Sequence, residues 1–269
     1  VPGSPLVILE AIREAEILVN VRQERRKPIL IDVELICIDA SEQSLDYLER
    51  LLRERGYGAA LAIGKVSIVK GEFADHCGAA IQRCHDRSPR SGRALFVLDQ
   101  YGYSDVPMHC LRDIFAKLKH AEVILTFYID ALIKYLNERN LAAFEKATGI
   151  SASVRASEID EIKQSPRWRV HLQSSLYRDL TDQCSAQFYT PFFVRPERGH
   201  GDFWLLHLSQ HWKARDVMAS THWQHHNHFA HYGDAGFHMF STGYISKIDD
   251  EHKLQAGFDF SEVAAAVSK

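Results

Sequence analysis

Three acidic residues are placed where they could hold a ligand: Asp39, Glu72 and Asp99. Each follows a run rich in Ile, Leu and Val, which is typical of a strand buried in a parallel sheet. Ligands bind such sheets beyond the carboxyl ends of the strands, where a carboxylate can accept both hydroxyls of a ribose. The three residues therefore indicate a ligand that contains a nucleoside. The alternative is that each of them merely caps the helix that follows.

The segment after the third of these runs contains further candidates. The apolar residues 94–98 end in the polar turn Asp99-Gln100-Tyr101-Gly102. Asp99 and Tyr101 stand where a ligand would bind, whereas Gly102 suits ordinary turn chemistry. On these residues alone, a binding site and a simple capped turn are equally good interpretations.

A histidine-rich segment at 222–231 (HWQHHNHFAH) is the second group of candidates. On a helix, His222 with His226, or His228 with His231, would share a face and could ligate a metal. The segment has no H-E-x-x-H pattern and no carboxylate, so a packed helix or a partner-binding surface explains it better. We therefore assign no metal ligand and keep a metal-dependent hydrolase as an alternative.

Composition restricts the partners and the location. The chain has 269 residues, a hydrophobic fraction of 46% and a formal net charge of −3, so no overall charge attracts it to nucleic acid. Basic residues interleaved with aromatic ones, as at 167–169, would still suit nucleic acid. No apolar run is long enough for a membrane span, which predicts no membrane partner. Five scattered cysteines without a CxxC pair favour a reducing, cytoplasmic location.

Strand-like and helix-like segments alternate through the first part of the chain. Strands are expected at 29–38, 65–70, 94–98 and 122–127, and helices at 6–21, from the cap Ser41 to Gly56, and at 77–85, 106–119 and 129–147. This alternation predicts a mostly parallel sheet with right-handed crossovers and helices on both faces.

The pattern changes after a linker at 149–157. A helix is expected at 168–184, strands at 187–195 and 203–209, and a last helix from 213 to near 229. This order suits either a small winged-helix-like unit or a hairpin that extends the main sheet. We therefore expect two domains, residues 1–150 and residues 151–269.

Several short motifs occur in an order that resembles the three-Cys-motif partner (TcmP) family. They are GSPL at 3–6, ICIDAS at 36–41, LFVLDQYGYSDVP at 95–107, EVILTFYIDAL at 122–132, FWLLHLSQHWKARDVM at 203–218 and HYGDAG at 231–236. Members are bacterial and resemble class I S-adenosylmethionine-dependent methyltransferases. The resemblance covers nearly the whole chain. It implies an α/β fold, a Rossmann-like methyltransferase sheet with a smaller C-terminal α+β (winged-helix-like) region, and a partner protein encoded nearby.

The resemblance also implies roles for cofactor-binding residues. Asp39 would hold the ribose of S-adenosylmethionine, and Glu72 and Phe73 would lie beside its adenine. Gly3 and Ser4 belong to the motif that opens the cofactor-binding part. The family's glycine-rich D-x-F-A-G-x-G segment would precede that motif and is not in this sequence. Because the sequence starts without Met, we expect the natural protein to have residues before it, the first strand of the sheet among them.

By the same resemblance, Asp99, Gln100, Tyr101 and Gly102 form the catalytic motif that faces the transferred methyl group. The layout is also similar to that of adenine-N6 methyltransferases of ribosomal RNA, in which this motif positions the target nitrogen and stacks on the base. Gln100 stands where the family more often has proline, whose ring would fix the backbone of the turn.

The sequence therefore predicts an S-adenosylmethionine-dependent N-methyltransferase, with a nucleic-acid base as the expected acceptor. One alternative is a non-catalytic protein that retains the fold and binds nucleic acid or a partner. The other is the metal-dependent hydrolase built on residues 222–231.

Overall fold

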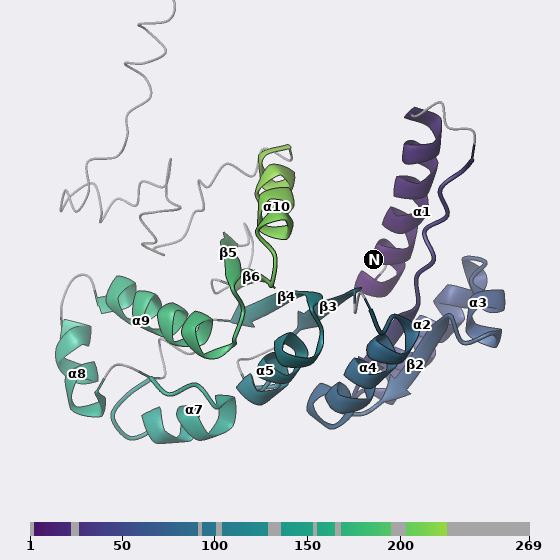
Figure 1. Ribbon diagram of the computed structural model, residues 1–269. Coiled ribbons are helices and arrows are strands. Elements are labelled where there is room, and N and C mark those ends of the chain that lie inside the picture. Colours follow the sequence, from purple (N-terminus) through teal and green to yellow (C-terminus); the bar gives the residue numbers. More distant parts are fainter. Residues whose placement is uncertain are drawn as a thin grey trace, which may run out of the picture. The chain divides into compact units, whose positions relative to one another are not determined.

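The computed structural model describes residues 3–22, 27–90, 93–100, 104–128, 136–152, 155–164, 168–194 and 203–224. The chain divides into two compact units, Val1–Ala80 and Ile81–Lys269, and each is described by itself. Both contain helices and strands (Figure 1), which confirms the α/β class at this level. The boundary between the units falls inside one helix, α4.

Unit 1 is built on two parallel strands. Its elements are α1 (Ser4–Arg22), β1 (Leu35–Asp39), α2 (Glu42–Glu54), α3 (Gly58–Ala62), β2 (Val66–Lys70) and the start of α4 (Phe73–Arg87). The register of β1 and β2 runs from Leu35↔Val66 to Asp39↔Lys70. Asp39 and Lys70 are therefore neighbours at the carboxyl end of the strand pair.

A small apolar core holds unit 1 together. Leu6 of α1 and Leu52 of α2 are 0% exposed, and Val66 of β2 is 3% exposed. The predicted cap of α2 is confirmed, since the side chain of Ser41 accepts the backbone N–H of Ser44 at 3.2 Å. Capping by Ser fixes where α2 starts and hence which of its sides faces the core.

The strand predicted at 29–38 is wrong over its first six residues, and side chains of α1 explain why. Asn20 accepts the backbone N–H of Ile29 at 2.7 Å and donates to the carbonyl of the same residue at 2.8 Å. Glu16 accepts the N–H of Ile31 at 2.8 Å. The segment is extended beside α1, but its backbone groups bond to side chains rather than to a neighbouring strand.

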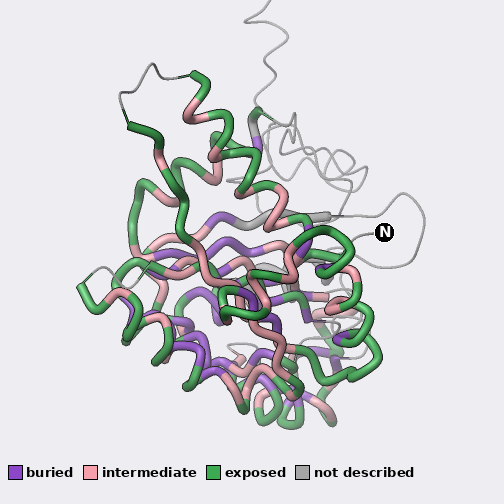
Figure 2. Tube along the Cα trace, turned by 90° about the vertical axis from the view of Figure 1, so that its right-hand side faces the viewer, coloured by how far each residue is buried: buried purple, intermediate pink, exposed green. Residues whose placement is uncertain are grey.

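This pairing of α1 with an extended segment leaves apolar side chains in solvent. Val21 is 77% exposed and Leu30 is 78% exposed. Figure 2 shows exposed and intermediate colours on both sides of the short grey trace that joins these segments, whereas buried residues gather on strands and their helices. The first turns of α1 thus pack in the core of unit 1, whereas its last turns are largely exposed.

Unit 2 is built on a mixed four-stranded sheet. Its elements are the rest of α4, β3 (Arg93–Asp99), α5 (Met108–Lys117), β4 (His120–Tyr128), α7 (Leu141–Thr148), α8 (Ala156–Gln164), α9 (Trp168–Gln183), β5 (Phe188–Val194), β6 (Phe203–Ser209) and α10 (Trp212–Gln224). The strand order is β3-β4-β6-β5, with β3 parallel to β4 and the other pairs antiparallel. The predicted pair of C-terminal strands thus extends the sheet of β3 and β4.

The single helix predicted at 129–147 is wrong at its centre. Asn137 accepts the backbone N–H of Arg139 at 2.9 Å and of Asn140 at 3.1 Å, and Asn140 accepts the N–H of Asn137 at 2.7 Å. Asn side chains compete with helical hydrogen bonds in this way, so the helix α7 begins only at Leu141. The linker predicted at 149–157 is also shorter, since α8 starts within it.

Side chains alternate between the two faces of β3 and β4. Phe96 and Leu98 of β3, and Val123 and Leu125 of β4, are buried. The opposite face of β3 is open, with Leu95 56% exposed and Val97 39% exposed. One face of this strand pair therefore belongs to the core of unit 2. On the other face β3 is exposed and β4 is mostly half-buried.

Replacing Leu52 by Ala should remove a central part of the unit 1 core. We expect the free energy of unfolding to fall by about 2–5 kcal/mol, because a cavity replaces a fully buried side chain. Urea unfolding followed by circular dichroism measures the change. The control is Ile63→Ala at a position 70% exposed, and an equal loss in both variants would contradict the assigned core.

Candidate functional site

Asp39 is the last residue of β1, and its carboxylate is exposed. The backbone N–H of Ser41 donates to Oδ1 of Asp39 at 2.7 Å. The backbone N–H of Gly71, just beyond β2, donates to the carbonyl of Asp39 at 3.0 Å. Asp39 therefore orders the turn before α2 but does not cap this helix, because the cap is Ser41. The bond from Ser41 orients the carboxylate of Asp39 at the carboxyl end of β1.

Lys70 is the register partner of Asp39, and its charge is matched by a carboxylate of α2. Nζ of Lys70 lies 2.5 Å from Oε2 of Glu42. The hydrogen bond and the charge of Lys70 lower the pKa of Glu42. We call the carboxyl end of β1 and β2, with the residues that follow each strand, the rim. It carries the carboxylates of Asp39, Glu42 and the exposed Glu72, and the ammonium of Lys70. Such a rim accepts hydroxyl groups and repels phosphate.

The connection from β2 to α4 depends on Gly71. Its φ is +146°, and a Cβ atom at this position would lie 2.3 Å from Nε2 of His76. The ring of His76 stays there because Nε2 lies 3.2 Å from the carbonyl oxygen of Lys70. Glu72 and Phe73, the residues predicted to lie beside adenine, come next, and Phe73 begins α4.

Gly3 and Ser4 stand at the start of α1. The carbonyl of Gly3 accepts the backbone N–H groups of Leu6 at 3.1 Å and Val7 at 3.3 Å, which opens the helix. Both residues are exposed, and Leu6 anchors this end of α1 in the core. All five residues predicted to bind the cofactor thus belong to unit 1.

Asp99 and Gln100 belong to unit 2, at the end of β3, and differ in surroundings. Asp99 is exposed, whereas Gln100 is 5% exposed. Oε1 of Gln100 accepts the backbone N–H of Val106 at 3.1 Å. Gln100 therefore fastens the end of β3 to the residues before α5. Tyr101 and Gly102 lie outside the described residues.

A buried histidine in the sheet of unit 2, hydrogen-bonded to a glutamate, was not predicted from the sequence. His207 of β6 is 2% exposed, and its Nε2 lies 2.8 Å from Oε2 of Glu122 on β4. This hydrogen bond, with a smaller contribution from the charge of His207, lowers the pKa of Glu122 against the opposing effect of burial. In the sequence, His207 is only one histidine within an apolar strand, and nothing there indicates its partner Glu122.

The described residues contain no metal-binding cluster, and burial affects the thiols of two cysteines. No three His, Cys, Asp or Glu side chains gather there in a way that could hold a metal ion. His222 is buried in α10, and the histidine-rich segment beyond residue 224 lies outside the described residues. Burial raises the pKa of Cys37 and of Cys184 to about 11, so both thiols stay protonated at neutral pH.

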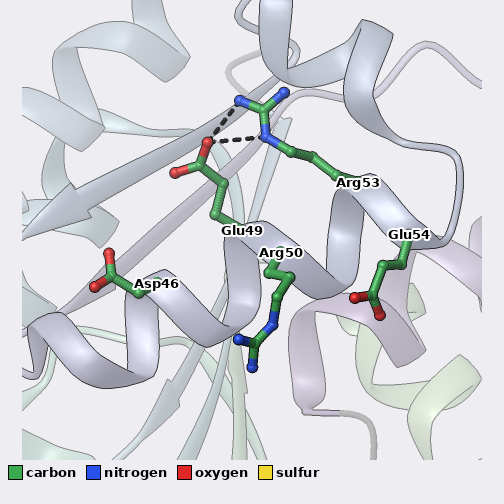
Figure 3. Close-up of a pocket in the computed structure, with 5 residues that line it drawn as sticks. All are labelled: Asp46, Glu49, Arg50, Arg53 and Glu54. Atoms are coloured by element: carbon green, nitrogen blue, oxygen red, sulfur yellow. Dashed lines mark hydrogen bonds and ion pairs between the residues drawn. The ribbon is translucent and has the colours of Figure 1, made fainter.

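A hollow on the outer side of α2 does not coincide with any predicted site residue. It is lined by Asp46, Glu49, Arg50, Arg53 and Glu54 (Figure 3). Arg53 lies 2.6 Å from Oε1 of Glu49 on the same helix, and both side chains are exposed. These charges satisfy one another at short sequence spacing, which is typical of a solvated helix surface.

No protein-family model matches the chain, and no curated protein matches it in sequence. Within the described residues, no helix has the length and apolar character needed to cross a membrane.

Replacing Gly71 by Ala should destabilise the rim of unit 1. The new Cβ would overlap the ring of His76 and the backbone conformation would be strained, so we expect a loss of about 1–3 kcal/mol. In a His76→Ala background the loss should shrink, because the overlap is gone. Gly78→Ala is the control: nothing lies within 4 Å of its Cβ position, and Ala favours helix by about 0.5–1 kcal/mol. Thermal unfolding of the four variants decides the outcome.

Glu122→Gln should reduce stability at neutral pH and have less effect in acid. The native pKa of Glu122 lies below 4.5, so its ionised form adds stability above that pH, and this is lost as the pH falls through the lower native value. We expect a loss of about 1 kcal/mol at pH 7, since the carboxylate is partly solvated. Urea unfolding at pH 7 and pH 3 measures it, with Asp113→Asn as an exposed control; a difference that grows in acid would contradict the assignment.

Proposed function

We propose that this protein is an S-adenosylmethionine-dependent N-methyltransferase that acts on a nitrogen of a nucleic-acid base. One observation carries the proposal. Asp39 and Asp99 are each the last residue of a strand in a parallel pair, and both carboxylates are exposed. That is the position at which ligands bind in parallel α/β sheets.

The strand order supports a Rossmann-like sheet. The Rossmann fold has the strand order 3-2-1-4-5-6. In that order, strands 3 and 2 are parallel neighbours on one side of strand 1, and strands 4 and 5 are parallel neighbours on its other side. The pairs β2-β1 and β3-β4 have this character. In this proposal, β5 and β6 are the hairpin that extends the methyltransferase sheet beside β4.

The residues of unit 1 fit a nucleoside that carries no phosphate. Asp39 would accept the ribose hydroxyls, and its orientation is set by the N–H of Ser41. The ammonium of Lys70 is paired with Glu42, so the carboxylates of Asp39 and Glu72 give the rim a net negative charge. That charge suits the positive sulfonium of S-adenosylmethionine. Glu72 and Phe73 would flank the adenine, and Gly3 and Ser4 would lie near the methionine end.

The residues of unit 2 would hold the acceptor. When bound, S-adenosylmethionine supplies an activated methyl group, so the nitrogen forms its new bond to carbon as the carbon–sulfur bond breaks and that electron pair stays on sulfur. Asp99 would accept an N–H of the acceptor and direct the nitrogen lone pair to the methyl group. It would then take the proton that the alkylated nitrogen loses. Positioning supplies most of the rate, because the donor is already reactive.

Binding of the demethylated product, S-adenosylhomocysteine, tests the cofactor site. We expect the protein to bind it in a calorimetric titration, and Asp39→Ala to weaken binding roughly 10- to 100-fold, as for the loss of hydrogen bonds to a charged group. Asp46→Ala, on the exposed side of α2, is the matched control.

Transfer of tritium from methyl-labelled S-adenosylmethionine to total RNA or DNA tests the reaction. Asp99→Ala should abolish transfer and keep product binding, whereas Asp113→Ala should preserve both. Binding without transfer in the unmodified protein would favour a non-catalytic protein that retains the fold. If the protein does not bind S-adenosylhomocysteine, the proposed function is wrong.

A further inference from the structure

The end of the unit 2 sheet that lies opposite to Asp99 carries exposed basic residues. Arg93 is the first residue of β3 and the register partner of His120, the first residue of β4. Lys119 directly precedes β4, and all three residues are exposed. A strand rises about 3.3 Å per residue, so this end is roughly 20 Å from Asp99 along β3. It is therefore separate from the candidate site at the carboxyl end of the strand pair.

The residues that join β6 to α10 reach the same end of the sheet. β6 runs antiparallel to β4 and ends at Ser209, opposite Glu122 near the start of β4. His211, Trp212 and Lys213 then lead into α10 (Figure 1), and all three are exposed. We call the exposed residues at this end of the sheet the basic patch: Arg93, Lys119, His120, His211, Trp212 and Lys213.

A hydrogen bond and a ring contact orient the aromatic part of the basic patch. Nδ1 of His211 accepts the backbone N–H of Lys213 at 3.1 Å, so the proton of the neutral ring is on Nε2, which can donate to a ligand. The ring of His211 stacks on Trp212, with the ring centroids 5.7 Å apart. Trp212 is 59% exposed, and its indole therefore presents a flat surface to solvent.

The charge of the basic patch is not cancelled by its neighbours. The carboxylate of Glu122, two residues into β4, is hydrogen-bonded to His207. The first turn of α10 contains no acidic residue. Within the part of the chain that the structure describes, no ion pair involves Arg93, Lys119 or Lys213. Three positive charges therefore face an anionic partner, in contrast to the rim of unit 1.

We propose that the basic patch binds single-stranded nucleic acid. Its three cations pair with phosphates, its two histidines donate hydrogen bonds to the backbone, and the indole of Trp212 stacks on a base. An acidic protein has no base for the indole to stack on, and one indole provides little apolar area for a lipid surface. Binding at this end of the sheet needs neither the cofactor nor Asp99, so the inference goes beyond the proposed methyl transfer and does not rest on it.

Fluorescence anisotropy with a labelled oligo(dT) of about 12 nucleotides, without cofactor, tests the inference. Three phosphate contacts to a single strand predict that the affinity falls roughly 20-fold between about 50 and 200 mM salt. Lys213→Ala should weaken binding and reduce this salt dependence by about a third, because it removes one of the three contacts. Trp212→Ala should weaken binding at least about 5-fold with the salt dependence unchanged, and Trp212→Phe should restore part of the affinity.

Controls separate the basic patch from the rest of the surface and from folding. Lys65→Ala removes an exposed cation of unit 1, and Tyr47→Ala removes an exposed aromatic ring there. Both variants should bind oligo(dT) as the unmodified protein does. Lys119→Ala, which lies outside any helix, repeats the charge test at a second position, and thermal unfolding shows that each variant is folded.

Each outcome either supports or overturns the inference. It is overturned if the unmodified protein does not bind oligo(dT) at low salt, or if the Lys119, Trp212 and Lys213 variants bind as the unmodified protein does. Equal competition by polyglutamate, or binding to phosphatidylserine vesicles without binding to oligo(dT), also overturns it, in favour of a general anion surface or a membrane surface. If the protein binds oligo(dT) but not S-adenosylhomocysteine, the proposed function is wrong and this inference stands.

Discussion

The parallel pairing of β3 with β4 is the constraint on which unit 2 depends. Because its register is fixed from Arg93↔His120 to Asp99↔Thr126, every second side chain enters the core and the others remain accessible. A slip of one residue would exchange the two faces. β4 also carries β6 on its other side, so the same strand sets the position of the C-terminal hairpin. Architecture and candidate chemistry therefore share one set of backbone hydrogen bonds.

Much of this architecture could be predicted from the sequence, because the signals were local and strong. Continuous apolar runs placed β2, β3 and β4, and Ser41 marked the start of α2. The failures occurred where polar side chains bond to nearby backbone. Asn20 and Glu16 satisfy the extended segment at 29–34, and the pair Asn137 and Asn140 interrupts an otherwise amphipathic stretch. Such bonds depend on the particular neighbours of a side chain, which apolar periodicity does not report.

The candidate site could be predicted at its strand ends and much less in its details. Acidic residues after apolar runs correctly placed Asp39 and Asp99 at the ends of β1 and β3. The hydrogen bond from the backbone N–H of Val106 to the buried side chain of Gln100 joins residues six positions apart, and the apolar pattern gives no sign of it. The pair of Glu122 with His207 needed the register of β4 with β6. Cross-strand partners far apart in the sequence become visible only when the strands are paired.

The crowding of Gly71 by His76 restricts how this part of the chain can vary between lineages. A side chain at position 71 would displace the imidazole beside it and would strain the backbone at the φ of +146°. A homologue that has lost glycine there therefore needs a moved or smaller side chain at position 76 and a rebuilt turn after β2. We thus expect the two positions to covary, with glycine and histidine inherited as a pair wherever the turn keeps its present shape.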